Sequence, residues 1–343
     1  MQYVNLGTCG LVVSRLSFGA MTFSSGNRDV PALYNVGSEI ADRLVGQALD
    51  AGINFFDTAD VYANGQSEEM LGRALAKRRK DVVICTKVGG RVGGGLYDAG
   101  LSRRHMMESI DLSLKRLGTD WIDLYLVHRD DPHVPMEEVV TTLDNIVRSG
   151  KVRYIGFSNW SAWRVAAAMD MMKTNNLTPF THGQMYYSLL ARDIESEFIP
   201  MLKQYGLGLT VWSPLAGGFL SGKYTREGIK EAASRLSDTD ILPLNRDKAY
   251  AVIDAMTPIA KTHDVSLAQI GIAWLLAKSA VSSVLLGATK THQLADTLAA
   301  ANVELTAAEL KTLDEASAIA KPYPAWFLDY FGDRVLEKAL RSK

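Results

Sequence analysis

Short, continuously apolar runs alternate along the chain with longer amphipathic segments. Runs such as VVICTK, IDLYLVH and GLTVWSP are rich in β-branched and aromatic residues. Continuous runs of this kind are typical of strands that are buried on both faces, as in a parallel sheet. Eight strands are predicted, over residues 16–20, 54–58, 82–87, 123–128, 154–158, 182–186, 209–213 and 283–287.

Between these runs, apolar residues recur with a period near 3.6, which predicts amphipathic helices. Ser102 is placed to cap one of them and Gly118 to end it, and Ser266 with Gln269 forms a capping-box pattern. Helices are predicted over residues 38–51, 67–79, 102–117, 135–149, 161–173, 194–205, 267–278 and 290–301.

Strand–helix alternation repeated eight times indicates an α/β fold with a parallel sheet, and eight units favour closure into a (β/α)₈ TIM barrel. The alternative is an open, doubly wound sheet. That fold usually has fewer strands and a glycine-rich first turn, whereas the first strand here is followed by GAMTFSSG, without the pattern G-x-G-x-x-G. We therefore expect residues 1–343 to form a single barrel domain.

Three segments extend beyond a bare barrel. Residues 1–15 are predicted to form a β-hairpin that plugs the bottom of the barrel. Residues 219–265, between the seventh and eighth strands, are long enough for an extended loop and an extra helix over 248–263. Residues 306–343 are expected to form a helix over 307–319 and an aromatic tail, both packed on the barrel.

Composition narrows the function classes. The 37 basic and 38 acidic residues nearly cancel, so neither nucleic acid nor an anionic membrane is an expected partner. No apolar stretch is long enough to span a membrane, and Met1–Gly10 lacks the features of a signal peptide. Cys9 and Cys85 are interpreted as free thiols, which is consistent with a cytoplasmic protein. No metal site is predicted, since HRDDPH at 128–133 has no accompanying HExxH motif or cysteine cluster.

Candidate chemistry lies where strands end. In a TIM barrel the active site is built at the carboxyl ends of the strands. Asp57, Lys87 and His128 end three successive strands, and Tyr62 follows five residues after Asp57. Each residue alone is more often a turn, surface or hydrogen-bonding residue, but a buried Asp and Lys side by side must pair. A nearby Lys87 is expected to lower the pKa of Tyr62 from its usual ~10 and make it a proton donor.

Long motifs then match a known family. FGAMTF (18–23), DTADVY (57–62), SLKRLGTDWIDLYLVH (113–128) and GKVRYIGFSN (150–159) occur in the family's order, and further matches extend over nearly the whole chain. The sequence resembles the aldo-keto reductases, most closely the branch that includes potassium-channel β-subunits and bacterial sugar-phosphate reductases. The resemblance implies a nicotinamide-dependent carbonyl reductase with Tyr62 as general acid, tuned by Lys87 and Asp57. His128, where some channel β-subunits carry Asn, would polarise and orient the carbonyl.

The resemblance also implies a cofactor site for NADPH/NADP⁺, with NADH as a weaker alternative. Ser158, Asn159 and Gln184 would hold the carboxamide, and Trp212 would stack on the nicotinamide ring. Thr297 departs from the Asn usual at its position, which puts one adenine hydrogen bond in doubt. The remaining matches are to the pyrophosphate loop (Ser213, Pro214, Leu215, Gly217, Lys223 and Arg235), to the 2′-phosphate region (Gly287, Thr289, Lys290 and Gln293) and to an adenine-side acid (Asp296).

The implied substrate is a small-molecule aldehyde or ketone that meets Met21, Tyr62, His128 and Arg129. Two other functions stay open: a dehydrogenase acting mainly in the oxidative direction, and a redox-sensing binding subunit. Homo-oligomerisation is also left open. Further candidates for the substrate walls are Phe23, Arg91, Trp160, Trp326 and Phe327.

Overall fold

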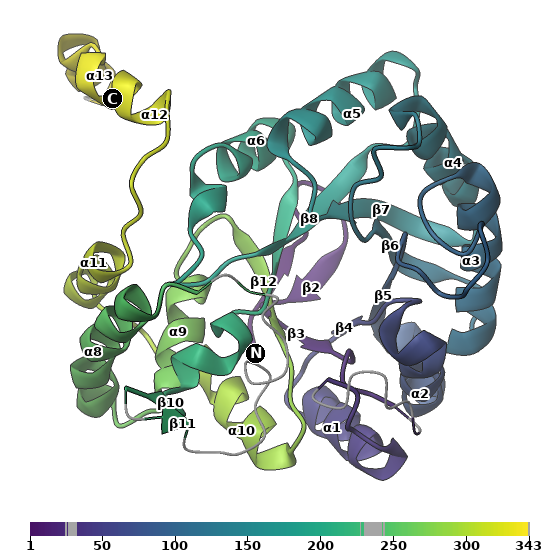
Figure 1. Cartoon of the computed structure of the whole chain (residues 1–343), viewed down its shortest axis with the longest axis horizontal. Coiled ribbons are helices and arrows are strands. Elements are labelled where there is room, and N and C mark those ends of the chain that lie inside the picture. The colour runs from purple at the N-terminus through teal and green to yellow at the C-terminus, as the bar shows by residue number, and fades with distance from the viewer. Residues whose placement is uncertain (25, 27–32, 227, 230–241, 243, 342–343) are drawn as a thin grey trace.

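The computed structural model describes the chain except for residues 25, 27–32, 227, 230–241, 243 and 342–343. Its centre is a closed barrel of eight parallel strands, in the order β12-β3-β4-β5-β6-β7-β8-β9 (Figure 1). Because β12 pairs with β3, the sheet has no edges, and the predicted (β/α)₈ barrel is confirmed over the open sheet. The strands are β3 (Leu16–Gly19), β4 (Phe55–Asp57), β5 (Val83–Val88), β6 (Ile122–Val127), β7 (Val152–Ser158), β8 (Phe180–Tyr186), β9 (Gly208–Trp212) and β12 (Val281–Leu286).

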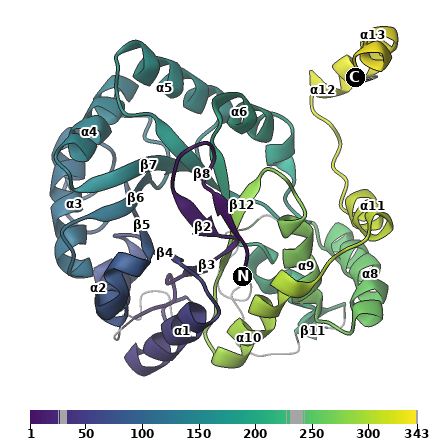
Figure 2. The same ribbon diagram turned by 180° about the vertical axis from the view of Figure 1, so that it is seen from behind.

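Helices surround the strands, as Figure 1 and the rear view in Figure 2 show. Among the helices that the structure describes, none is long and apolar enough to cross a membrane. The helices are α1 (Ser38–Asp50), α2 (Gln66–Leu75), α3 (Arg103–Leu117), α4 (Met136–Arg148), α5 (Ala162–Thr174), α6 (Phe198–Tyr205), α8 (Arg246–His263), α9 (Leu267–Leu276), α10 (Thr291–Ala299), α11 (Ala307–Ala316), α12 (Ala325–Phe331) and α13 (Arg334–Arg341).

Capping residues explain where these helices begin and end. The Ser102 side chain accepts from the backbone N–H of His105 at the start of α3, and Gly118 takes the left-handed conformation at its end (φ 62°). Ser266 caps α9 in the same way, through the Gln269 backbone N–H. The reciprocal bond, from the Ser266 N–H to the Gln269 side-chain oxygen, is not among the contacts of the described residues; the Gln269 side chain is directed to Asp296, to which its Nε2 donates at 2.7 Å.

The amino-terminal hairpin closes one end of the barrel, as predicted. Strands β1 (Tyr3–Asn5) and β2 (Val12–Ser14) pair antiparallel, and β2 crosses the barrel in the rear view of Figure 2. Leu6 and Val13 are fully buried against residues inside the barrel, among them Phe55 and Val83. The amino ends of the strands are thus sealed by apolar packing, and the carboxyl ends are left for polar chemistry.

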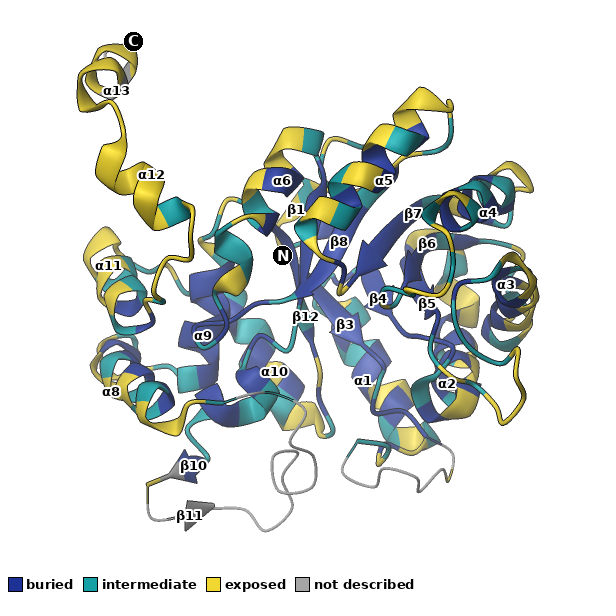
Figure 3. Ribbon diagram, turned by 45° about the horizontal axis from the view of Figure 1, so that its top comes forward, coloured by how far each residue is buried: buried dark blue, intermediate teal, exposed yellow. Residues whose placement is uncertain are grey.

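The segment after α11 differs from the prediction. Leu313 of α11 is buried, and His263 of α8 lies 2.9 Å from Glu309, so this helix packs on the barrel as expected. Beyond it, residues 320–341 project away from the barrel and are mostly exposed (Figure 3), so the expected packing of the tail is wrong. Pro322 and Pro324 disfavour a helix in the connection, since each lacks the N–H that a helical hydrogen bond needs.

A polar cluster lies outside the barrel, between the strands and helices α2 and α3. Glu68 is fully buried and accepts from Thr86 Oγ1 and Arg116 Nε, each at 2.6 Å. Asp60 is also buried, but neither of its carboxylate oxygens has a side-chain hydrogen-bond partner among the described residues. Burial, and then repulsion from Glu68, raise the pKa of Asp60 to about 8, while Arg116 and Lys87 act against the shift.

The contact between α2 and α3 supplies a first prediction. A Cβ on Gly72 of α2 would lie 2.4 Å from the Leu117 carbonyl oxygen of α3, so Gly72→Ala must force the helices apart. We expect a loss of about 1–3 kcal/mol in the free energy of unfolding, measured by urea denaturation. Gly46→Ala in α1 is the matched control, because nothing lies within 4 Å of that Cβ. It should stabilise the protein by about 0.5–1 kcal/mol, and equal effects of the two changes would contradict this packing.

The buried carboxyl group of Asp60 supplies a second prediction. Its pKa is about 8 in the folded protein against 3.8 ordinarily, so between these values the folded state holds a proton that the unfolded state has lost. Stability is then lost as the pH rises through this range. Asp60→Asn removes the titration, and its stability relative to the wild type should increase by about 2–4 kcal/mol between pH 5 and pH 8.

Urea denaturation at both pH values tests this expectation. Asp120→Asn, which changes an exposed aspartate, should show no comparable pH dependence. If the free energy of unfolding changed equally between pH 5 and pH 8 in the wild type and in Asp60→Asn, Asp60 would be ionised in the folded protein and the prediction would be wrong.

Candidate active site

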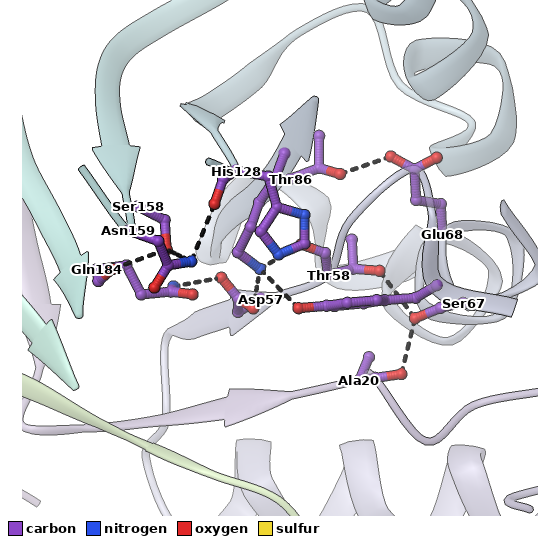
Figure 4. Close-up of polar contacts among 12 residues, drawn as sticks. Ala20, Asp57, Thr58, Ser67, Glu68, Thr86, His128, Ser158, Asn159 and Gln184 are labelled. Carbon is purple, nitrogen blue, oxygen red and sulfur yellow. Dashed lines mark hydrogen bonds and ion pairs between the residues drawn. The ribbon is translucent and has the colours of Figure 1, made fainter. Parts of the chain in front are cut away.

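The carboxyl ends of the strands meet at one rim of the barrel, and the candidate groups gather there (Figure 4). Asp57 ends β4, Lys87 is the penultimate residue of β5, and His128 directly follows β6. Tyr62 opens η1 (Tyr62–Gly65), a short 3₁₀ helix between β4 and α2. The four side chains come from three neighbouring strands and the loop after the first of them, so barrel closure brings them together.

Lys87 and Asp57 form a buried ion pair. Lys87 Nζ lies 2.5 Å from Asp57 Oδ1, and their side chains are 0% and 2% exposed. The ammonium also donates to the Thr58 carbonyl oxygen at 2.7 Å, and Gln184 Nε2 donates to the other Asp57 oxygen at 2.8 Å. Burial disfavours the ammonium, but Asp57 and then Tyr62 outweigh it and raise the pKa of Lys87. The predicted pairing is therefore present, and Lys87 stays charged at neutral pH.

Tyr62 lies beside this pair, with its Oη 3.5 Å from Lys87 Nζ. The predicted lowering of its pKa is wrong: burial raises the pKa of Tyr62, and the opposing effect of Lys87 is smaller. The prediction considered the charge alone, whereas taking a phenolate out of water also carries a large cost. The phenol consequently holds its proton at neutral pH.

Polar side chains that the sequence analysis did not select hold the loop around Tyr62. Thr58 and Ser67 share a hydrogen bond of 2.8 Å between their hydroxyls, and Ser67 donates to the Ala20 carbonyl oxygen at 2.7 Å (Figure 4). Ala63 and Asn64 both have positive φ, a costly conformation for residues other than glycine. No spacing in the sequence indicates these contacts, because they join residues from separate strands and loops.

His128 faces the phenol of Tyr62. The two ring centroids are 5.6 Å apart with planes at 81°. Burial, followed by the charges of Lys87 and Arg129, lowers the pKa of His128 to about 3. The imidazole is therefore neutral at neutral pH and can donate one N–H to an uncharged acceptor.

The residues expected to hold a carboxamide are linked to one another beside His128. Asn159 Nδ2 donates to Ser158 Oγ at 2.9 Å and to the His128 carbonyl oxygen at 3.0 Å. Ser158 Oγ donates to the Gln184 carbonyl oxygen at 2.7 Å (Figure 4). Trp212 Nε1 donates to Asn159 Oδ1 at 3.2 Å, and its ring stacks on Tyr186 with centroids 4.9 Å apart. Tyr186 was missed by the sequence analysis.

The loop after β9 is a tight turn next to a lysine. Ser213, Gly217 and Gly218 all have positive φ, and the Gly217 N–H donates to Ser213 Oγ at 3.0 Å. A Cβ on Gly218 would lie 3.3 Å from Lys223 Cε, so the absence of a side chain leaves room beside this cation. The N–H groups of Ala216, Gly217 and Gly218 already donate within the turn, so it is the space beside the Lys223 cation that fits a pyrophosphate. Pro214 and Leu215 shape the same turn, whereas Arg235 lies outside the described residues.

The predicted adenosine-side residues lie in the turn after β12 and in the first two turns of α10. Gly287 has nothing within 4 Å of an added Cβ, and Lys290 is exposed at the N-cap position of α10. The Gln293 side chain accepts from both the backbone N–H and the hydroxyl of Thr289, each at 3.1 Å. Open space and a cation at a helix N-terminus are compatible with a phosphate group.

The side chains of Asp296 and Thr297 in this region already form hydrogen bonds within the protein. The Asp296 carboxylate accepts from Ser266 Oγ at 2.8 Å and from Gln269 Nε2 at 2.7 Å, so it is fixed to α9. The Thr297 hydroxyl is buried and donates back to carbonyl oxygens of its own helix. Thr297 therefore does not offer the side-chain contact that an Asn would.

The structure separates the substrate candidates. Met21 is half-buried and Arg129 is exposed, so neither is enclosed in the core, and their contact with a substrate stays a prediction. Phe23 is fully buried and Trp160 is 2% exposed, packed against Phe157 and Phe180. These two are core residues and not substrate walls, because their rings fill the space behind the strands. Arg91 is exposed and donates to carbonyl oxygens of its own loop, while Trp326 and Phe327 lie in the projecting tail.

Comparison with known proteins agrees with this geometry. Residues 15–318 match the model of the aldo/keto reductase family. The chain is 41% identical over 333 residues to a "Probable voltage-gated potassium channel subunit beta" of Oryza sativa subsp. japonica, covering 94% of this chain and 98% of that protein. It is 34% identical to the "Versiconal hemiacetal acetate reductase" of Aspergillus parasiticus, covering 92% and 96% of the two chains. The protein therefore belongs to the aldo/keto reductase family and is an NAD(P)H-dependent oxidoreductase.

Proposed function

We propose that the protein reduces an aldehyde or ketone to an alcohol with NADPH, and that Tyr62 protonates the carbonyl oxygen. The observation that carries this proposal is the position of the Tyr62 phenol, 3.5 Å from the Lys87 ammonium at the mouth of the barrel. A protonated phenol beside a fixed positive charge can release its proton to an oxygen that gains negative charge, because the ammonium stabilises the phenolate left behind.

Lys87 and Asp57 assist this proton transfer without contacting the substrate. Asp57 and the Thr58 carbonyl oxygen hold the ammonium in place, so its charge is aimed at Tyr62 and does not need to reorganise. Burial alone would make Tyr62 a weaker acid, and Lys87 offsets part of that effect. The pair thus lowers the cost of proton release from the half-buried phenol of Tyr62, while that phenol stays protonated in the resting protein.

His128 has a separate part in this mechanism. Its pKa of about 3 keeps the ring neutral, so it can donate a hydrogen bond to the substrate carbonyl without competing for the proton of Tyr62. The edge-to-face arrangement of the Tyr62 and His128 rings lets two donors converge on one oxygen. Arg129, exposed beside His128, and Met21 would contact the rest of the substrate.

The cofactor would be held by residues around the same mouth. When bound, the reduced nicotinamide supplies the hydride that the carbonyl carbon accepts. Ser158, Asn159 and Gln184 would contact its carboxamide and Trp212 its ring, in agreement with their mutual hydrogen bonds. Lys223, beside the space left by Gly218, would hold the pyrophosphate.

A second candidate function has support from the relatives named as potassium-channel β-subunits, which match over most of their length. The chain would then be a redox-sensing subunit of a larger complex. The presence of Asp57, Tyr62, Lys87 and His128 together favours turnover. Two assays decide between these functions. NADPH consumption with an aldehyde such as a nitrobenzaldehyde shows whether the protein turns over or only binds. Comparison with the reduction of NADP⁺ by alcohols shows the preferred direction.

Substitution of Tyr62 and Lys87 tests the proton donor. Tyr62→Phe keeps the ring but removes the proton, so the turnover number should fall by roughly 10²- to 10⁴-fold while cofactor binding is nearly unchanged. Lys87→Met should lose nearly as much, and the double variant little more than either single variant, because the two residues act as a unit. The three turnover numbers are measured at saturating NADPH.

Tyr125→Phe is the matched control. It also removes a buried phenolic hydroxyl, but one on the outer side of the barrel with no hydrogen-bond partner among the described residues, and it should retain activity. If the double variant lost the product of the two single losses, Lys87 and Tyr62 would act independently and the mechanism would be wrong.

Lys290 is expected to favour NADPH over NADH. A 2′-phosphate beside this exposed cation and the N-terminus of α10 would gain charge-assisted hydrogen bonds, each worth ~1.5–3 kcal/mol. Lys290→Ala should raise the KM for NADPH by about tenfold or more and leave the KM for NADH nearly unchanged. Lys311→Ala, in α11, removes another exposed cation and should change neither value. Equal changes for both cofactors would show that Lys290 does not contact the phosphate.

A further inference from the structure

Residues 320–341, called the C-terminal arm below, carry an unusual amount of exposed apolar surface. Of the sixteen large apolar side chains that are exposed in the described part of the chain, nine lie in this arm. Tyr330 is 75% exposed and Val335 82%. The arm lies outside the ring of helices in Figures 1, 2 and 3. Monomeric proteins rarely leave a contiguous apolar surface of this kind in water.

Most of the exposed apolar residues form one stripe on each of the two helices, and Tyr323 and Leu328 lie off it. In α12 the stripe consists of Trp326, Phe327, Tyr330 and Phe331, and in α13 of residues 335, 336, 339 and 340. Both repeat at i, i+1, i+4 and i+5, which places them on one helix face. Among the ring contacts of the described residues, those of the arm join only arm residues, such as Phe327 and Phe331 at 4.5 Å.

The lengths of these helices require a packing partner. Helices α12 and α13 have seven and eight residues. Isolated helices shorter than about 12–15 residues are marginal in water, and helices in proteins are stabilised mainly by packing of their apolar face. The barrel does not supply that packing, since the arm projects away from it. Another molecule must cover the stripe.

We propose that a second copy of this chain covers it, so that the C-terminal arms of two subunits pack face to face across a twofold axis. The exposed apolar area of the stripe is consistent with a second copy of the chain as the partner. With about 150–250 Å² for each fully exposed aromatic side chain and somewhat less for the aliphatic ones, the exposed fractions of the stripe residues amount to roughly 750 Å² per subunit. A stable protein interface needs about 800 Å² from each partner.

The charges of the arm point to the same occupant. Lys321 pairs with Asp329 within the arm, Asp333 accepts from the backbone N–H groups of Val335 and Leu336, and Arg334 is exposed. In a twofold interface each patch meets its own copy, so it must carry both signs to be complementary to itself. An anionic membrane or a nucleic acid would instead be matched by a uniformly basic polar face. The described charges of the arm are of both signs: Arg334 and Lys338 of α13 are basic, whereas Asp329 and Asp333 are acidic, so the arm as a whole is not uniformly basic.

Sedimentation equilibrium of the full chain, over about 0.1–100 μM, tests this assembly. The wild type should show a concentration-dependent dimer or a higher assembly built from it. Phe331→Asp places an unpaired charge in the centre of the proposed interface and should weaken the dimer by about 100-fold. Leu336→Asp, on the other helix, should act in the same direction. Trp163→Ser is the control, because it removes a 67% exposed aromatic from α5, outside the arm.

The variants should keep the thermal unfolding temperature of the barrel, because the arm does not pack against it. A cross-link then identifies the partner: Tyr330→Cys in a Cys9→Ser background should form a disulfide-linked dimer on oxidation, since Cys85 is buried. A wild type that stays monomeric at all concentrations would overturn the proposal. So would an assembly unaffected by both arm variants, or a monomer whose arm binds vesicles of phosphatidylcholine and phosphatidylserine.

Discussion

At the mouth of the barrel, the Lys87 ammonium and the Asp57 carboxylate lie 2.5 Å apart with almost no exposure to water. Neither charge could be buried alone, because removing one partner of such a pair typically costs about 3–5 kcal/mol. The pair is in turn held by the Thr58 carbonyl oxygen and the Gln184 amide. The position of Tyr62, the charge near its phenol and the proposed proton transfer all depend on this arrangement.

The barrel makes this arrangement possible by being different at its two ends. At the amino ends of the strands, the hairpin inserts Leu6 and Val13 among apolar residues and excludes water. At the carboxyl ends, adjacent strands place Asp57 and Lys87 side by side, and His128 follows on the next strand. A closed, apolar base below a polar mouth keeps the ion pair in an environment of low dielectric constant, where its effect on Tyr62 is strongest.

The motif DTADVY contains two aspartates whose surroundings are opposite in character. Asp57 points into the barrel and accepts hydrogen bonds from Lys87 and Gln184. Asp60, three residues later, lies outside the barrel near Glu68 and is favoured in its neutral form. The two residues are chemically identical, so the difference comes from the surroundings of each carboxyl group: Lys87 and Gln184 at Asp57, and burial near Glu68 at Asp60. One short motif therefore supplies a charged residue to the active site and a neutral, buried residue to the packing outside the barrel.

The sequence by itself determined the eight strands, the surrounding helices, the hairpin and the residues at the strand ends, since hydrophobic periodicity and capping are local properties. Family motifs indicated Asp57, Tyr62, Lys87 and His128 because these residues occur at recognisable spacings. Only the tertiary structure decided the raised pKa of Tyr62, the core positions of Phe23 and Trp160, and the exposure of the C-terminal arm. Each of these depends on burial, and burial is set by contacts between residues far apart along the chain.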